Sequence, residues 1–230
     1  MTKVYFVRHA EAEGNVKEFF QGRIDCDISE KGKIQLEYLA KRFESIDYDT
    51  IYSSPLKRAM ATANAVNRRL KLPIIEREDI IEIHGGVWEG MLWTDIEKKY
   101  PAEHNLWKND MKNFYVEGSE RMSEVYERMI KAVDSIVREN EDKTVVVVSH
   151  GCALRNYLSY AEFGSADRLG DVGWSDNTAV SLIEYDEALR PKIIFKNDSS
   201  HLPPEASTLA FSHWSKYDEK GNRNNENTCS

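Results

Sequence analysis

The sequence predicts an α/β protein of three layers, α/β/α, with a mostly parallel central sheet covered by helices on both faces, together with a helical insertion. Short apolar runs alternate with segments of helical periodicity, an order typical of parallel strands joined by crossover helices. The run Thr144-Val-Val-Val-Val148 is β-branched throughout, which indicates a central strand. Residues 83–143 instead combine helical patterning with three tryptophans, and we interpret them as the insertion.

The chain begins with a predicted strand, a loop and a helix. Val4–Val7 is a continuous apolar run, typical of a strand buried on both faces. A polar loop with Gly14 and Gly22 follows to about Ser29. Ser29 is a suitable N-cap for the next helix. The apolar positions of that helix, at helical spacing, are Leu36, Leu39, Ala40 and Phe43.

A second strand and helix are predicted from residue 50 onward. Thr50–Ser53 is the strand. Ser54 would cap the helix and Pro55 would take its first position, where the missing N–H of proline costs nothing. The helix should run to about Leu70, and Pro73–Glu76 is a third short strand.

The second half of the chain adds two helices and three strands. Ser119–Arg138 has apolar residues at helical spacing, which predicts an amphipathic helix packed on the core. A further helix should begin at Gly151, directly after the valine-rich strand. The last strands are Ala179–Tyr185 and Lys192–Lys196. We expect residues 1–211 to form one domain and the polar residues 212–230 to form a C-terminal tail.

Composition excludes several classes of protein. The 230 residues carry 31 Lys+Arg and 39 Asp+Glu, and the net charge of −8 disfavours nucleic-acid binding. Three scattered cysteines make neither a disulfide framework nor a metal site. No apolar run approaches the roughly 20 residues that span a bilayer, and the N-terminal apolar run is too short for a signal peptide. We therefore expect a cytoplasmic protein without membrane partners. The sequence leaves monomer and homodimer open.

Two histidines follow predicted parallel strands directly. Arg8-His9 ends the first strand, and His150-Gly151 follows the valine-rich strand. Because ligands bind beyond the carboxyl ends of such strands, these side chains are expected to meet at one edge of the sheet. Two more groups are expected there, Arg58 in the first turn of its helix and Glu82 before a glycine loop.

This set of residues suits phosphoryl transfer. Planar guanidinium groups match phosphoryl oxygens in a bidentate manner. A neutral imidazole is a competent nucleophile near pH 7, and a carboxylic acid can protonate the leaving oxygen and later accept a proton from water. The helix at Gly151 would add N–H groups and the positive end of its dipole. No metal or other cofactor is required.

The same residues resemble a known family. The opening Phe6-Val-Arg8-His9-Ala10-Glu-Ala-Glu-Gly14-Asn15 closely resembles the signature of the histidine phosphatase superfamily, or phosphoglycerate mutase-like proteins. Further matches, in the family's order over about residues 4–200, are Gln21-Gly22, Ser53-Ser-Pro-Leu-Lys-Arg58, Glu82 with Gly86-Val-Trp-Glu-Gly90, and Val148-Ser-His150-Gly151. The late strands and Asn197-Asp-Ser-Ser-His201-Leu-Pro203 resemble the bacterial phosphatase branch.

The resemblance implies a phosphoglycerate mutase-like fold and a role for each matching residue. His9 would be the phosphorylated nucleophile, and Glu82 the proton donor and acceptor. The groups around the phosphoryl moiety would be Arg8, Arg58 and His150. The residues lining the pocket would be Asn15, Gln21 and Gly22. The implied activity is metal-independent hydrolysis of small phosphorylated metabolites.

The chain departs from the family pattern at two places. The family often has an aromatic residue after Gln-Gly and a proline in the next turn, where this chain has Arg23 and Cys26-Asp27. The insertion usually carries Gly-Glu-Ser, where this chain has Glu117-Gly-Ser-Glu120. Both departures leave the charged centre intact and concern leaving-group specificity. His84 lies two residues after Glu82, and its ring either faces the pocket or has a structural role.

Three alternative functions are weighed against phosphomonoester hydrolysis. A phosphoglycerate mutase needs extra cations, whereas residues 83–143 carry nine Lys/Arg and thirteen Asp/Glu, a net charge of −4, which favours hydrolysis. A non-catalytic pseudophosphatase would lack a core residue, and none is missing. Asp25-Cys-Asp27 superficially resembles the paired aspartates of magnesium-dependent phosphatases, but no apolar strand precedes it. No serine-hydrolase elbow or phosphate-binding glycine loop is present.

Overall fold

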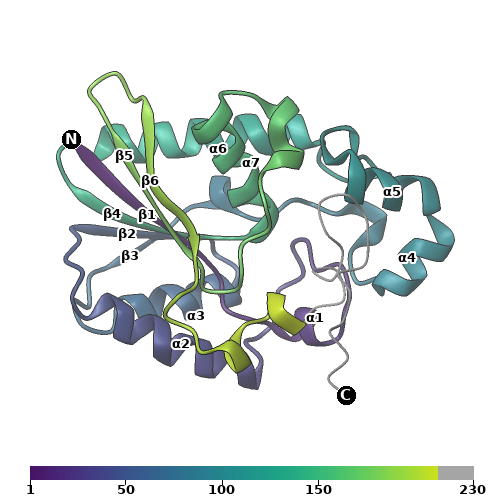
Figure 1. The fold of residues 1–230 in the computed structure, drawn as a ribbon, viewed down its shortest axis with the longest axis horizontal. Helices are drawn as coiled ribbons and strands as arrows, with labels where there is room; N and C mark the ends of the chain where they lie inside the picture. The colour runs from purple at the N-terminus through teal and green to yellow at the C-terminus, as the bar shows by residue number, and fades with distance from the viewer. Residues whose placement is uncertain (212–230) are drawn as a thin grey trace, which may run out of the picture.

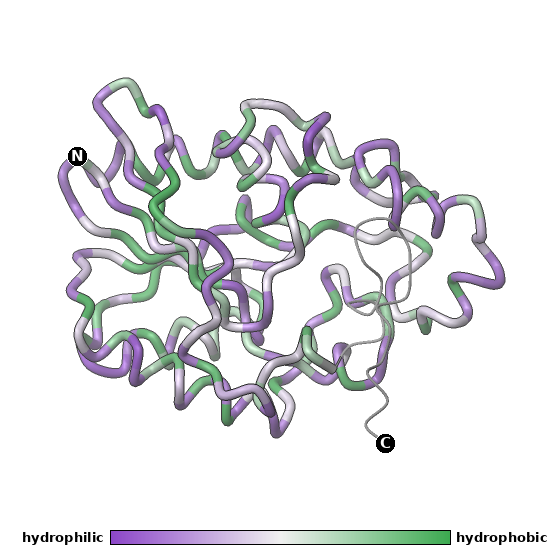
Figure 2. The backbone as a smooth tube through the Cα atoms, viewed as in Figure 1, coloured by the Kyte–Doolittle hydropathy of each residue, from purple (hydrophilic) through white to green (hydrophobic). Residues whose placement is uncertain are grey.

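Six strands form one sheet in the order β3-β2-β4-β1-β5-β6 in the computed structural model, which describes residues 1–211. The strands are β1 (Thr2–Arg8), β2 (Thr50–Ser53), β3 (Ile74–Glu76), β4 (Thr144–Ser149), β5 (Val180–Tyr185) and β6 (Pro191–Asp198). The first four are mutually parallel, and β5 and β6 run antiparallel to their neighbours. The predicted mostly parallel sheet is confirmed, and hydrophobic residues recur along its strands (Figure 2).

Helices cover both faces of the sheet, as predicted (Figure 1). The helices are α1 (Glu13–Val16), α2 (Glu30–Phe43), α3 (Lys57–Val66), α4 (Trp93–Lys99), α5 (Pro101–Asn109), α6 (Met122–Glu139) and α7 (Gly151–Phe163). Helices α2 and α3 pack on one face, and α6 and α7 on the other. Helices α4 and α5 lie to one side of the sheet. Within residues 83–143, α6 therefore belongs to a covering layer.

Successive side chains of the central strands point to opposite faces of the sheet and so contribute to a hydrophobic core on each face. In β4, Val145 and Val147 pack with α6 and α7, whereas Val146 and Val148 pack with α2 and α3. All four valines are fully buried. Burial of a β-branched side chain of this size stabilises the fold by about 1.5–3 kcal/mol, so this strand anchors the sheet from its centre.

The register of β1 and β4 sets the position of both histidines. Arg8 pairs with Ser149 at the last rung of the parallel ladder. The next residue of each strand, His9 and His150, therefore leaves the sheet at the same level and edge. The His9 N–H donates to the Ser149 carbonyl (3.0 Å) and extends the ladder by one bond.

Two predicted helix starts differ from the structure. Ser29 caps α2 as expected, and its hydroxyl accepts the Gly32 N–H (2.9 Å). Helix α3, however, begins at Lys57 and ends at Val66, inside the predicted limits of Ser54 and Leu70. The N-cap position is Leu56 and not Ser54, whose hydroxyl bonds to His150 (2.7 Å).

Helix α6 begins at Met122, three residues after the predicted start at Ser119. The Ser119 hydroxyl instead closes a local turn with the main chain of Val116. The predicted tail, residues 212–230, lies outside the described residues. Among residues 1–211, no helix has the length and apolar character required to cross a bilayer.

Candidate active site

The imidazoles of His9 and His150 face each other beyond the ends of β1 and β4. Their ring centroids are 5.1 Å apart with an angle of 55° between the planes. Both side chains are buried, at 3% and 0% exposure. The expected meeting of the two strand-terminal histidines is therefore observed.

A main-chain contact fixes the tautomer of His9. Its Nδ1 lies 2.7 Å from the Ala10 carbonyl oxygen, which can only accept a hydrogen bond. Nδ1 therefore carries the proton, and the lone pair is on Nε2. Burial, followed by the charges of Arg58 and Arg8, lowers the pKa of His9 well below its usual value, so the ring is neutral near pH 7.

His150 is neutral for the same reasons. Burial and the charge of Arg58 lower the pKa of His150 well below its usual value. Its Nε2 bonds to the Ser54 hydroxyl, and its Nδ1 has no partner among the described residues.

Arg8 lies against the first residue of α7. Its guanidinium donates to the Ser175 carbonyl, and its Nε is buried without a partner among the described residues. A Cβ added to Gly151 would lie 3.3 Å from the Arg8 Cζ, closer than most real Cβ contacts. Glycine at this position thus lets the guanidinium approach the start of the helix.

Arg58 reaches the same region from α3 and is held by a loop. Its two terminal nitrogens donate to the carbonyls of Gly22 and Ile24, both at 2.7 Å. Its Nε is buried without a partner among the described residues. Burial lowers the pKa of both guanidinium groups, and the charge of Glu82 partly offsets this effect. Both stay cationic at neutral pH, because free arginine titrates above about 12.

Three buried nitrogen atoms without partners among the described residues belong to groups that interact electrostatically with one another. They are Nε of Arg8, Nε of Arg58 and Nδ1 of His150. A buried donor left unpaired costs about 1–3 kcal/mol. The two arginine donors and their positive charges, with the His150 ring nitrogen beside them in the same electrostatic cluster, suit an oxyanion with several acceptor oxygens.

Glu82 lies at the N-terminus of α7. Its carboxylate oxygens accept the N–H groups of Cys152 (3.1 Å), Ala153 (3.0 Å) and Ile83 (3.0 Å). The first two are N–H groups that α7 was expected to offer to a phosphoryl moiety. They instead orient Glu82, whose charge acts on both Arg8 and Arg58.

The loop residues expected in the pocket make contacts within the loop and with Arg58. The Asn15 side chain accepts the Ala12 N–H (3.0 Å) and closes the turn of α1. The Gln21 side chain packs over Gly14, and its buried Oε1 has no partner among the described residues. Gly22 has a φ of 48°, a left-handed conformation that favours glycine, and directs its carbonyl at Arg58.

Sequence reasoning missed the segment before β5. Asn177 Nδ2 donates to the His9 carbonyl (2.9 Å), and the Thr178 N–H donates to the Arg8 carbonyl (3.1 Å). The buried Asp176 carboxylate accepts four bonds, from Ser207 Oγ and the N–H groups of Asn177, Thr208 and Leu209. The negative charge of Asp176 also raises the pKa of Arg8, against the larger effect of burial. The polar run Ser175-Asp-Asn-Thr178 directly before an apolar strand was the available signal.

Two other histidines, His84 and His201, have structural contacts. His84 Nδ1 lies 2.8 Å from the Gly118 carbonyl oxygen, and the backbone N–H of His84 donates to the Glu120 carboxylate. His201 bonds to Thr178 and Arg42. Within residues 1–211, no group of three His, Cys, Asp or Glu side chains is arranged to hold a metal ion.

Comparisons with known proteins agree with this geometry. Residues 4–198 match the family model of the histidine phosphatase superfamily (branch 1). Phosphoserine phosphatase 1 of Hydrogenobacter thermophilus is 36% identical over 206 residues, which cover 88% of this chain and 95% of that protein. The metal-independent phosphoserine phosphatase of Arabidopsis thaliana is 30% identical over 173 residues, covering 74% and 73%.

Solved structures share the fold. The structure of Bacillus stearothermophilus YhfR superimposes with a TM-score of 0.83 at 31% identity and covers 87% of this chain and 99% of that one. The similarity thus includes the sheet and both layers of helices.

Proposed function

This chain belongs to the histidine phosphatase superfamily, and on that premise we propose that it hydrolyses small phosphomonoesters through a phosphohistidine formed on His9, without a metal ion. That it is a phosphomonoester hydrolase follows from its membership and from relatives named as phosphatases. The mechanism and the class of substrate are our proposal. The observation that carries them is the group of three buried, unpartnered nitrogens of Arg8, Arg58 and His150, together with the contact between the rings of His150 and the neutral His9.

In the first step, Nε2 of His9 attacks phosphorus and the bond to the ester oxygen breaks. Arg8 and Arg58 neutralise the charge on the phosphoryl oxygens. With the Ser54 hydroxyl donating to Nε2 of His150, the proton of that ring is on Nδ1 and adds a third donor. Glu82 takes up a proton as the phosphate group binds and gives it to the leaving oxygen, so the alcohol departs neutral.

In the second step, water attacks the phosphohistidine and the bond between phosphorus and Nε2 breaks. Glu82, now ionised, accepts a proton from the water. Three backbone N–H groups hold its carboxylate in position. His9 is thereby regenerated as a neutral ring, and inorganic phosphate leaves the two arginines.

Fixed cations support metal independence. A transferring phosphoryl group spreads its charge over three oxygens, and the site offers two guanidinium groups whose backbone contacts hold them in place before substrate arrives. Their electrostatic stabilisation replaces the role that Mg²⁺ has in other phosphatases.

The test is hydrolysis of p-nitrophenyl phosphate, phosphoserine and 3-phosphoglycerate, with and without a chelator. We expect phosphate release from p-nitrophenyl phosphate and from at least one metabolite, at rates that the chelator does not change. Conversion of 3-phosphoglycerate to its isomer without phosphate release would indicate a mutase. Inactivity on every ester would indicate a pseudophosphatase, and loss of activity with the chelator would indicate a metal enzyme.

A further inference from the structure

Arg23, which stands where the family often has an aromatic residue, contacts the segment that carries the proposed proton donor. Its Nε donates to the main-chain carbonyl of Glu82 (3.2 Å). It directly follows Gly22, whose carbonyl holds Arg58. Arg23 is therefore linked through the backbone to the proposed proton donor on one side and to a phosphoryl-binding arginine on the other.

The main chain and side chain of Arg23 are both held. Its N–H donates to a Glu89 carboxylate oxygen (2.9 Å), which also accepts the Gly85 N–H. Its guanidinium pairs with Glu120 at 3.0 Å and keeps 35% of the side chain exposed. A guanidinium held in this way and open to solvent is ready to meet a ligand with little loss of entropy.

Glu120 is shared between two arginines. Nε and Nη2 of Arg128 each donate to one of its oxygens at 3.1 Å. Burial raises the pKa of Glu120, but bonds from Arg128 and the His84 N–H lower it by more, so the carboxylate is ionised. Two cations thus share one anion, and this rim cluster (Arg23, Arg128 and Glu120) has a net charge of +1.

Resting on the proposed function, we propose that Arg23 is a specificity residue that binds a carboxylate on the leaving group. Glu82 must reach the ester oxygen, and Arg23 contacts the backbone of Glu82, so an anion bound by Arg23 lies about one glutamate side chain from that oxygen. This matches a small alcohol whose carboxylate is two or three bonds from the ester.

Two pairs of esters isolate the carboxylate. Phosphoserine differs from phosphoethanolamine, and 3-phosphoglycerate from glycerol 3-phosphate, essentially by that group. We expect the wild-type protein to have a higher kcat/KM on the carboxylate member of each pair. In Arg23→Met this preference should fall by roughly 10- to 100-fold, mainly through KM, because a charge-assisted hydrogen bond is lost from substrate binding. Arg23→Lys should keep part of the preference.

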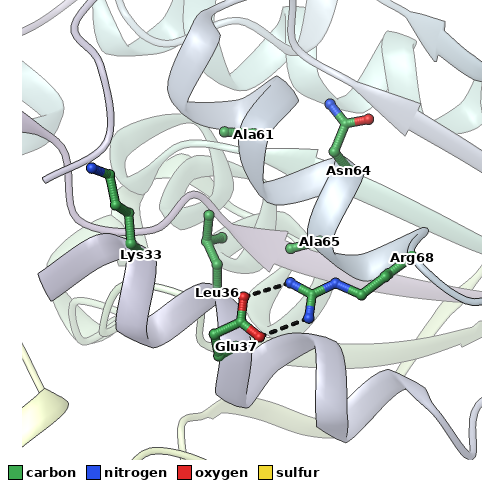
Figure 3. A pocket seen from close by; sticks show the side chains of 7 residues that line it. All are labelled: Lys33, Leu36, Glu37, Ala61, Asn64, Ala65 and Arg68. Carbon is green, nitrogen blue, oxygen red and sulfur yellow. Dashed lines mark hydrogen bonds and ion pairs between the residues drawn. The ribbon is translucent and has the colours of Figure 1, made fainter. Parts of the chain in front are cut away.

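A matched control removes an equivalent charge elsewhere. Arg68 pairs with Glu37 through both terminal nitrogens, at 2.7 and 2.6 Å, in the groove between α2 and α3 (Figure 3). Arg68→Met loses the same charge from a similar exposed pair but lies outside the proposed site. We expect it to leave the preference for carboxylate esters unchanged. Unchanged inhibition of Arg23→Met by inorganic phosphate would show that Arg8 and Arg58 stay in place.

The outcomes separate this assignment from the proposed function. If p-nitrophenyl phosphate and all four esters are inert, the proposed function is wrong and the assignment fails with it. If the esters are hydrolysed without preference for the carboxylate, or if Arg23→Met lowers both members of each pair equally, only the assignment of Arg23 is wrong. A greater dependence on Arg23 for a bisphosphate than for the carboxylate esters would likewise overturn it.

Discussion

Acidification should destabilise this protein because two buried imidazoles are held neutral beside two arginines. His9 and His150 are almost fully buried, and burial lowers the pKa of each well below its usual value. In the unfolded chain each imidazole has an ordinary pKa of about 6.5. The unfolded state therefore takes up protons below pH 6.5, whereas the folded state does not. Stability is fully present above that pH and is lost as the pH falls.

The expected loss follows from linkage. Between pH 7.5 and 5.5, each histidine whose folded form stays neutral lowers the free energy of unfolding by about 1.4 kcal/mol. His9 and His150 together account for about 2.7 kcal/mol. Burial lowers the pKa of the partly exposed His201 to about 4, so this ring also stays neutral in the folded state over this range and adds a loss of the same sign.

Urea unfolding followed by tryptophan fluorescence at the two pH values, at one ionic strength, measures this difference. The control is His150→Gln, which keeps a polar group beside Ser54 but does not titrate. Its pH-dependent loss should be smaller than that of the wild-type protein by about 1.4 kcal/mol. Stability that is unchanged or greater at pH 5.5 would refute the conclusion that the two imidazoles are buried and neutral.

Two further variants test the neighbouring groups. Glu82→Gln should slow hydrolysis of alkyl phosphates far more than hydrolysis of p-nitrophenyl phosphate, whose leaving group needs little protonation, and equal losses would show that Glu82 is not the acid. Asp176→Ala removes the acceptor of four hydrogen bonds in a buried position, and we expect urea unfolding to show a loss of about 3 kcal/mol. A loss below about 1 kcal/mol would mean that Asp176 does not anchor the segment before β5.

The meeting of His9 and His150 could be predicted from sequence because it depends on one rule of sheet geometry. Two adjacent parallel strands end at the same edge, so residues directly after them meet. The same rule does not find Asp176 and Asn177, which precede a strand. Strand β5 is antiparallel, so its first residues lie at the edge where β1 and β4 end. The sequence contains no comparable signal for the direction of that strand.

Contacts of individual side chains are harder to predict than the fold. Ser54 followed by Pro55 has the pattern of a helix start, yet its hydroxyl bonds to His150, 96 residues away in the sequence. Glu82 was one of several acidic residues near a glycine loop. Glu82 is the one that contacts the N-terminus of α7, through a hydrogen bond from a residue 70 positions away in the sequence. Such contacts depend on tertiary packing, which local propensity does not encode.

The most direct test of the mechanism is to quench the enzyme during turnover and locate bound phosphate by mass spectrometry under alkaline conditions. We predict acid-labile phosphate on the peptide containing His9, no label on the peptide containing His150, and neither label nor turnover in His9→Ala. Phosphate on another residue, or full turnover by His9→Ala, would contradict attack by the imidazole at the end of the first strand.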